Sequence, residues 1–339
     1  MVSLYFCGLW IFPIILFILY KFVTNLKQYR RPDELGLPPG PRPWPVIMFL
    51  RLGSVPTVVI SSPAMAREFL KTRDLVFANR PATSFGKYVA YDRKDVGYAP
   101  YGEYWRQMRK LCTIELFTVK RTESFKSVRE EEVSAMLRSI LLESEQGIHC
   151  VNVKQSLSSL TQNIVCRMFS SRTYSDDELS GGMVFREMVS EISAVAGAFC
   201  IGDYIPFLDW LDLQGLRRRM RAVDKVFGGF AEKVIDEHIN CRRVEKERGQ
   251  EEQGVKDIVD VLLNMAESES QGKEMKITRV HIKAIIMDIL SAGVETTSTT
   301  LEWAISELIR NPYVMEKAQQ EIDLVAGRHR LLKQSDVEN

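Results

Sequence analysis

Residues 291–299, with the sequence SAGVETTST, place a glycine, a carboxylate and several hydroxyls inside an apolar run that otherwise reads as one helix. Glycine costs a helix about 1 kcal/mol relative to alanine and threonine somewhat less, so helix stability does not explain these residues. Gly293 would let a flat or bulky group approach the backbone. Thr296 can bond a carbonyl one turn back or leave that carbonyl free to hold water, which bends the helix locally. Glu295 can serve as a proton source or relay. The pattern indicates proton transfer beside an opened helix; the alternative is a tolerated glycine with surface Glu and Thr.

A second pattern could bind a carboxylate. In the stretch YGEYWRQMRKLC, Trp105 and Arg109 are four residues apart and therefore share one face of a predicted helix. An indole N–H and a guanidinium on one face suit a carboxylate, and the arginine gives charge-assisted hydrogen bonds. Taken alone, the pair is better explained by a tryptophan packed in the core beside a surface arginine, and the carboxylate site gains support only beside the pattern at 291–299.

The helix that positions Gly293 is predicted to be long. Thr278 is a plausible N-cap, and Asn311 followed by Pro312 stops the helix. Roughly thirty residues at 1.5 Å per residue give about 45 Å, enough to run through the middle of a domain.

The rest of the chain predicts a mainly α fold with a small N-terminal β-sheet. Helical periodicity dominates from about residue 100 onward, whereas two short β-rich runs flank residues 53–56 and predict a hairpin. Ser62 is a predicted N-cap with Pro63 at the first helical position. The charged stretches 217–221 and 242–256 are interpreted as solvated helix faces and ends.

Composition narrows the class of protein. The chain has 339 residues, 45% of them hydrophobic, which is enough for one large or two modest globular domains. Its 45 basic residues balance 44 acidic ones, so no nucleic-acid partner is expected. Its six cysteines form no CxxC pair, which argues against a zinc ribbon, a redox dithiol or a disulfide framework.

The N-terminus reads as a membrane anchor. Residues 4–20 carry no charge, and Phe22 and Val23 extend this apolar run past Lys21 to the ~20 residues that a helix needs to cross a bilayer. Residues 1–23 are therefore the predicted anchor. Basic residues follow directly, which places the remaining chain on the cytosolic side. A cleaved signal peptide is the competing interpretation, but no small-x-small cleavage site follows the apolar run. Residues 24–47, basic and then proline-rich, are predicted to be a stiff hinge, and residues 48–339 to form the body.

Together these motifs resemble those of the cytochrome P450 superfamily, the haem-thiolate monooxygenases. The central helix of that family carries Ala/Gly-Gly-x-Asp/Glu-Thr-Thr/Ser, and residues 292–297 match every position. The Trp-x-x-x-Arg element, PPGP at 38–41 and FANRP at 77–81 are similar to those of the large plant microsomal group. The resemblance runs over nearly the whole chain, from the anchor to the last residues.

The resemblance implies a function and a set of site residues. It implies a haem beside Ala292 and Gly293, proton delivery by Glu295 and Thr296, and a haem propionate at Trp105 and Arg109. It also implies that one oxygen atom from O2 is inserted into an apolar small molecule, with electrons from NADPH through a flavoprotein reductase, at the endoplasmic reticulum membrane with a cytosolic catalytic domain. The loop 82–98, the helix near 289–294 and the apolar stretch 197–210 would contact substrate or its access channel.

The sequence also departs from the family pattern. None of its cysteines lies in the family's Phe-x-x-Gly-x-Arg-x-Cys-x-Gly loop, so no metal ligand is assigned and the domain is expected to be incomplete at the C-terminus. The family's Glu-x-x-Arg is missing from its proper place, since residues 307–310 and 245–248 match only by chance. About thirty residues that the family places after PRPWPVI are absent. This chain alone is therefore expected to be inactive; the alternatives are a non-catalytic, membrane-tethered helical protein that binds no haem, and a soluble helical ligand-binding module.

Overall fold

The chain is described by a computed structural model, which covers residues 47–146, 150–174, 185–248, 256–268, 276–327, 330 and 332–336. The predicted anchor 1–23 and all but the last residue of the predicted hinge 24–47 lie outside these residues. In the part that is covered, no helix is both long and apolar enough to span a bilayer. The chain divides into two compact units, one ending at Ala78 and the other beginning at Asn79.

The first unit contains the predicted hairpin. Strands β1 (Ile47–Leu52) and β2 (Val55–Ile60) pair antiparallel, with Leu52 opposite Val55. Gly53 closes the turn at φ 61°, a left-handed conformation that glycine adopts without steric cost. Strand β1 runs straight through the junction of residues 47 and 48, where the sequence predicted a missing segment. Three short helices follow: α2 (Pro63–Arg67), the π-helix η2 (Glu68–Thr72) and α3 (Asp74–Phe77). The Ser62 hydroxyl accepts the Met65 N–H at 3.3 Å, which confirms the predicted N-cap.

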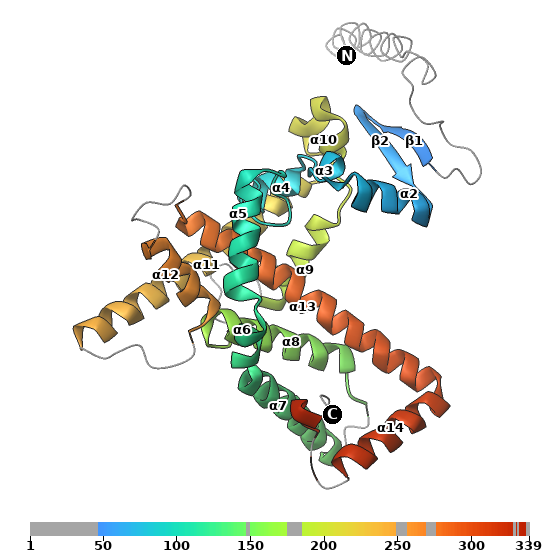
Figure 1. The fold of residues 1–339 in the computed structure, drawn as a ribbon, viewed down its shortest axis with the longest axis vertical. Helices are drawn as coiled ribbons and strands as arrows, with labels where there is room; N and C mark the ends of the chain where they lie inside the picture. The colour runs from blue at the N-terminus through green and yellow to red at the C-terminus, as the bar shows by residue number, and fades with distance from the viewer. Residues whose placement is uncertain are drawn as a thin grey trace, which may run out of the picture. The chain divides into compact units, whose positions relative to one another are not determined.

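The second unit is helical in the residues that the structure describes (Figure 1). Its elements, in chain order, are α4 (Ser84–Tyr88), α5 (Glu103–Leu111), the π-helix η3 (Cys112–Leu116), α6 (Val119–Ser124), α7 (Lys126–Glu145), α8 (Val153–Ser170), α9 (Phe185–Ala196), α10 (Ile201–Tyr204), the 3-10 helix η5 (Pro206–Leu211), α11 (Leu216–Glu247), α12 (Ile258–Ser268), α13 (Arg279–Arg310), α14 (Pro312–Ala326) and the 3-10 turn η7 (Gln334–Asp336). The prediction of a mainly α fold with a small sheet is confirmed.

The long central helix is α13, and its ends are where the sequence predicted them. Thr278 caps it in a capping box with His281, and Asn311 lies at its C-terminal end. Its 32 residues extend over about 48 Å at 1.5 Å per residue. The helix packs against α8, α9, α11 and α12 (Figure 1), and its buried residues lie between Ile282 and Ser298. Most of residues 299–310 are exposed, so only the first two thirds of the helix run inside the bundle as expected.

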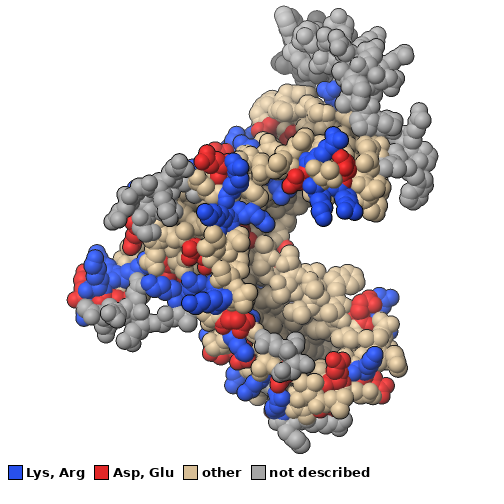
Figure 2. Space-filling model, viewed as in Figure 1, with Lys and Arg blue, Asp and Glu red and all other residues tan. Residues whose placement is uncertain are grey.

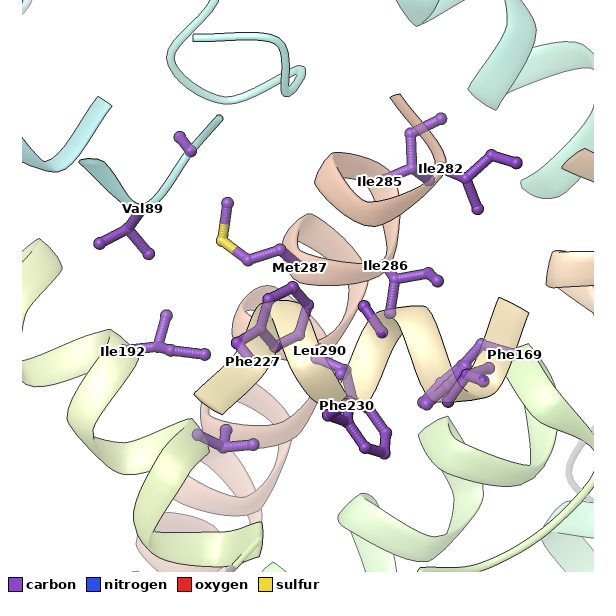
Figure 3. Packing of buried hydrophobic residues seen from close by; sticks show 14 of the residues in the cluster. Val89, Phe169, Ile192, Phe227, Phe230, Ile282, Ile285, Ile286, Met287 and Leu290 are labelled. Atoms are coloured by element: carbon purple, nitrogen blue, oxygen red, sulfur yellow. The ribbon is translucent and has the colours of Figure 1, made fainter. Parts of the chain in front are cut away.

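The core lies where α13 meets α11 and α8. Met287 and Leu290 of α13 lie against Phe227 and Phe230 of α11 (Figure 3), and all four are buried. Phe169 of α8 meets Phe230 edge-on, with ring centroids 6.3 Å apart. Aromatic pairs in this arrangement contribute about 0.5–1.5 kcal/mol beyond the area they bury, so this cluster helps to set the position of α13.

Basic and acidic side chains are interspersed on the surface that Figure 2 shows. Most of the described residues of the two charged stretches are exposed, as predicted, including Arg218, Arg219 and Arg221, but two arginines are less solvated. Arg217 keeps only 20% of its side chain exposed, pairs with Asp209 at 3.3 Å and stacks on Tyr88. Arg242 keeps 14% of its side chain exposed and pairs with Asp260 at 3.0 Å. The prediction was wrong at these positions because other elements pack over α11 and supply carboxylates for its arginines.

Candidate functional site

The predicted oxygen-handling strip lies on one side of α13. Ala292 and Thr296 are exposed, Glu295 is half-buried, and Val294 and Ser298 on the opposite side are buried. The Thr296 hydroxyl donates to the Ala292 carbonyl one turn back, which is one of the two arrangements that the sequence allowed. The strip is therefore an accessible run of small and hydroxyl side chains with one carboxylate beside it.

The predicted local unwinding of α13 is wrong. Every residue from Arg279 to Arg310 is α-helical. Ser291 and Thr300 also donate to carbonyls one turn back, at 2.8 Å each. Bonds of this kind can bend a helix slightly, but here the helix continues without a break through all three residues.

Gly293 does allow a close approach, but the group that approaches is another helix. A Cβ added to Gly293 would lie 3.2 Å from Cγ2 and 3.8 Å from Cγ1 of Val165 on α8. The missing side chain thus lets α8 and α13 pack closely. The sequence predicted that something bulky needed this space, yet one chain position cannot show that the neighbour is Val165.

Trp105 and Arg109 share one face of α5, as predicted. The Arg109 guanidinium carbon lies 5.3 Å from the centroid of the Trp105 ring, a cation–π contact. Trp105 is half-buried and Arg109 is exposed. Arg109 forms no ion pair with any residue that the structure places, so its N–H groups are available to a carboxylate.

The indole N–H, in contrast, already has a partner within the protein. Trp105 Nε1 donates to the Val96 carbonyl at 3.0 Å. The same loop residue donates its own N–H to Oδ2 of Asp288 on α13 at 2.7 Å. Val96 therefore ties the helix of Trp105 to the helix of the oxygen-handling strip, and this connection brings the two predicted motifs together.

The loop that makes this connection has an unusual backbone. Tyr91, Asp92 and Arg93 have φ values of 50°, 56° and 60°, three consecutive left-handed residues without a glycine. Each costs roughly 1–2 kcal/mol, with Asp penalised least. The turn is held by hydrogen bonds from the Arg93 N–H to the Gly86 carbonyl at 2.8 Å and from the Lys94 N–H to the Ala90 carbonyl at 3.0 Å.

Two carboxyls under this loop were missed by sequence reasoning. Asp95 is fully buried and accepts the Tyr98 N–H at 2.9 Å, while Asp288 lies one helical turn before Ala292. Burial, followed by the neighbouring Asp95, raises the pKa of Asp288 to about 8. Burial also raises the pKa of Asp95. An aspartate within the apolar run AIIMDIL was the available signal, since a buried carboxylate needs a partner.

The thiols within the bundle are not suited to bind iron as thiolates. Burial raises the pKa of Cys112 to about 12 and also raises the pKa of Cys166. Both therefore keep their protons near neutral pH, and a metal ligand must lose its proton. Cys200 is buried and its sulfur donates toward the Ser84 hydroxyl at 3.7 Å.

One cluster of potential metal ligands has a structural explanation. His238, Asp257 and Asp260 bring ligand atoms within 4.8 Å of one another. His238 Nε2 lies 2.9 Å from Asp257 Oδ2, Asp257 Oδ1 accepts the Asp260 N–H at 2.9 Å, and Arg242 binds the Asp260 carboxylate. The polar atoms thus satisfy one another and join α11 to the start of α12.

The fold and the site together define a class of protein: a helical bundle whose central helix carries an acid and a hydroxyl. A loop connects that helix to the cation–π pair of Trp105 and Arg109. The Cytochrome P450 family model matches residues 41–339. The chain therefore belongs to the cytochrome P450 family.

Individual relatives agree with this family. The chain is 46% identical over 346 residues to cytochrome P450 750A1 of Pinus taeda, covering 95% of this chain and 65% of the relative. It is 39% identical over 292 residues to cytochrome P450 71A1 of Persea americana, and this match covers 86% of this chain and 57% of the relative. It is 35% identical over 355 residues to the flavonoid 3'-monooxygenase of Petunia hybrida, and this match covers 96% of this chain and 67% of the relative. The chain thus spans between 57% and 67% of the length of these relatives.

Proposed function

We propose that the protein is a haem-dependent monooxygenase that inserts one oxygen atom from O2 into an apolar small molecule. Membership of the cytochrome P450 family supports this, as do relatives named monooxygenases. The structural observation that carries the proposal is the connection through Val96, which joins Trp105 beside Arg109 to the helix of Glu295 and Thr296.

The residues present fit one face of a haem and its carboxylate side chains. Arg109 offers unpaired N–H groups beside an aromatic ring, and Ala292 and Thr296 offer an accessible surface of small side chains. When bound, haem supplies the iron that binds and activates O2. Burial raises the pKa of the Cys112 and Cys166 thiols, which disfavours either of them as a thiolate ligand of the iron.

Arg109 would bind a haem propionate, and Trp105 would hold Arg109 in position. Because the indole N–H is committed to Val96, the guanidinium donates the charge-assisted hydrogen bonds, and Trp105 holds it in place through the cation–π contact. Trp105 then acts on the propionate only through Arg109 and through the loop. Lysine in place of Arg109 would retain the charge but lose the planar fork of N–H donors.

Glu295 and Thr296 are the residues that move protons. The half-buried Glu295 carboxyl can give a proton to a neighbouring hydroxyl, and Thr296 Oγ1 can pass one on toward the reacting oxygen. In this structure that hydroxyl donates to the Ala292 carbonyl, so it must first rotate away. General acid catalysis of this kind contributes typically 10²–10⁴-fold to a rate.

The substrate, the partner and the location belong to the same proposal. An apolar small molecule would be contacted by the loop 82–98 and by α13 near Ile289. Electrons would come from NADPH through a flavoprotein reductase, with residues 1–23 anchoring the protein in the endoplasmic reticulum membrane. The relative from Petunia hybrida is named a flavonoid 3'-monooxygenase, so an aromatic small molecule is a candidate substrate to test.

A carbon monoxide difference spectrum tests the proposal. The protein is expressed with a haem supply, reduced, and exposed to carbon monoxide; a Soret band of the thiolate type supports a haem-thiolate enzyme. A protein that binds haem without this band lacks the axial ligand. A protein that binds no haem is the alternative, a non-catalytic, membrane-tethered helical protein.

The proton relay has a matched control on the same helix. Thr296→Val removes the proposed donor, and Thr300→Val removes a hydroxyl that makes the same kind of hydrogen bond one turn further on. With a reductase present, Thr296→Val should release more hydrogen peroxide per NADPH oxidised, whereas Thr300→Val should match the parent protein. Equal effects of the two substitutions would remove Thr296 from the proposed relay.

A further inference from the structure

The loop from Tyr91 to Tyr98 is fastened to α13 by carboxyls rather than by apolar packing alone. Val96 donates its N–H to Asp288 Oδ2 at 2.7 Å, and Tyr98 donates its N–H to Asp95 Oδ2 at 2.9 Å. Asp95 is fully buried, and its Oδ1 receives no N–H or other O–H donor from the residues that the structure describes. The carboxyl of Asp288 lies close to that of Asp95, because Asp288 Oδ1 and Asp95 Oδ2 would both be within 3.5 Å of a Cβ at Gly97.

Two carboxyls can hydrogen-bond to each other only if one of them carries a proton. Both carboxyls lie within 3.5 Å of the position of a Cβ at Gly97, and Asp95 is fully buried, so one of the two carboxyls keeps its proton and can share it with the other. Gly97 allows the carboxyls to lie directly beneath the loop, because a Cβ at that position would be 3.2 Å from Asp95 Oδ2 and 3.5 Å from Asp288 Oδ1. When the proton is lost, two negative charges remain together in a site that is shielded from water, and they repel each other.

The backbone conformation of the loop is unfavourable, so contacts with the rest of the protein must stabilise it. The three left-handed residues Tyr91, Asp92 and Arg93 lie immediately before Asp95. A run of this kind persists only where surrounding contacts hold it in place. Two more contacts help to hold the loop: the Tyr104 hydroxyl donates to the Lys94 carbonyl at 2.6 Å, and Trp105 Nε1 donates to the Val96 carbonyl.

We propose that Asp95 and Asp288 form a proton-held latch that fixes the loop 91–98 on α13, so that Asp288 positions one wall of the substrate site and loss of the shared proton releases it. The proposal rests on the proposed function, because the site in question is the one beside Ala292 and Glu295. Asp288 lies four residues before Ala292 and seven before Glu295, hence on the same side of α13. The latch is a positioning device and does not itself react.

The other titratable groups around the pair do not supply this response. Tyr98 of the loop, Tyr104 of α5 and Cys112 of η3 face the two carboxyls, and burial raises the pKa of each. All three therefore stay neutral as the pair ionises. In the parts of the chain that the structure covers, no Arg, Lys or His forms an ion pair with Asp95 or Asp288; Arg80 and Arg109 act on Tyr98 and Cys112, and Lys94 on His281.

The direction of the pH response follows from the proton count. Closed, the latch keeps a proton up to about pH 8, whereas an exposed aspartate loses it near pH 4. Closing the loop therefore takes up a proton, and the closed form is favoured at low pH and weakened as the pH rises toward 8. One linked proton changes the opening equilibrium by about tenfold per pH unit in this window.

Hydrogen–deuterium exchange on the full chain tests the latch without substrate or activity. Exchange is read on the peptide that contains Val96, at several values from about pH 6 to 8, and each rate is divided by the intrinsic rate at that pH. The parent protein should lose up to about tenfold of its protection per pH unit. Tryptic cleavage after Arg93 and Lys94 gives a second readout and should accelerate in the same direction.

Two substitutions and a control separate the latch from general unfolding. Asp288→Asn keeps an acceptor for Val96 and adds an N–H for Asp95, so protection should remain high and become independent of pH. Asp288→Ala removes both contacts, so the peptide should exchange quickly at every pH. Asp224→Asn removes a carboxyl of α11 whose pKa is also raised by burial but which faces Lys283, so it should leave the response of the Val96 peptide unchanged.

Three outcomes would overturn the latch: protection in the parent protein that does not change with pH, a response of Asp288→Asn that equals that of the parent, or full protection in Asp288→Ala. The carbon monoxide spectrum is read on the same preparations. A chain that binds no haem but shows the expected exchange keeps the latch and loses the proposed function. A chain that binds haem but shows no pH response loses the latch alone.

Discussion

Gly293 offers a test whose expected sign depends on a contact that the sequence does not reveal. In an open helical position, replacing glycine by alanine stabilises a helix by about 1 kcal/mol. At Gly293 the new Cβ would meet Val165 Cγ2 at 3.2 Å, so Val165 or the backbone must move by a few tenths of an ångström. Overpacking of this kind costs typically 1–3 kcal/mol. We therefore expect Gly293→Ala to lower the free energy of unfolding by up to about 2 kcal/mol.

Removing the obstructing methyl groups should reverse that sign. Val165→Ala alone costs up to about 1.6 kcal/mol, at about 0.8 kcal/mol for each of two methyl groups, because Val165 is only partly buried. In that background Gly293→Ala no longer meets Cγ2, so it should stabilise by the helical gain of about 1 kcal/mol. The two substitutions are then coupled by about 1–3 kcal/mol, within the range measured for residues in contact.

Urea unfolding followed by far-ultraviolet circular dichroism measures all four members of this cycle. Gly229→Ala is the matched control, because Gly229 lies inside α11 with nothing within 4 Å of an added Cβ, so that substitution should stabilise by about 1 kcal/mol in either background. Additive effects of Gly293→Ala and Val165→Ala would refute the assignment of Gly293 to helix packing. A stabilising Gly293→Ala in the parent protein would refute it as well.

Three further predictions concern stability and binding. Leu290→Ala should destabilise the protein by about 2–5 kcal/mol, measured by urea unfolding, because the side chain is fully buried in the aromatic cluster; no change would mean that the core is arranged differently. Burial disfavours charge on His238, but its hydrogen bond and charge interaction with Asp257 outweigh this and raise its pKa, so the stabilisation is fully present below about pH 6.5 and is lost as pH rises through the folded value. The melting temperature should therefore fall over that window in the parent and stay level in His238→Gln. Arg109→Ala should change stability by no more than about 1 kcal/mol, since an exposed cation–π contact is all it loses, while haem affinity measured by titration should fall; unchanged haem affinity would remove Arg109 from the site.

The parts of the fold that sequence reasoning predicted correctly are governed by local chemistry. The start of α13 follows from a threonine cap and its end from an Asn-Pro pair, both of which act within a few residues. The hairpin follows from two β-rich runs around Gly53, and Ser62 acts on an amide three residues away. The shared face of Trp105 and Arg109 follows from the pitch of a helix.

The errors and omissions arise where a distant segment supplies the partner. Arg217 and Arg242 read as solvated because their carboxylate partners come from η5 and α12. Asp288 read as an ordinary member of an apolar run, although it holds a backbone amide 192 residues earlier in the chain. The indole of Trp105 read as a donor to a carboxylate, whereas the loop before its helix already supplies the acceptor.

By itself the sequence determined the family, the mainly α class, the limits of the central helix and the residue types at the candidate site, because each depends on composition, spacing or contacts within a few residues. Only the tertiary structure decided what those residues face. It placed Val165 against Gly293, drew Val96 between Trp105 and Asp288, and brought two carboxyls together under a left-handed turn. The physical reason is that burial and pairing depend on which segments pack together, and that packing minimises the free energy of the whole chain rather than of any one stretch.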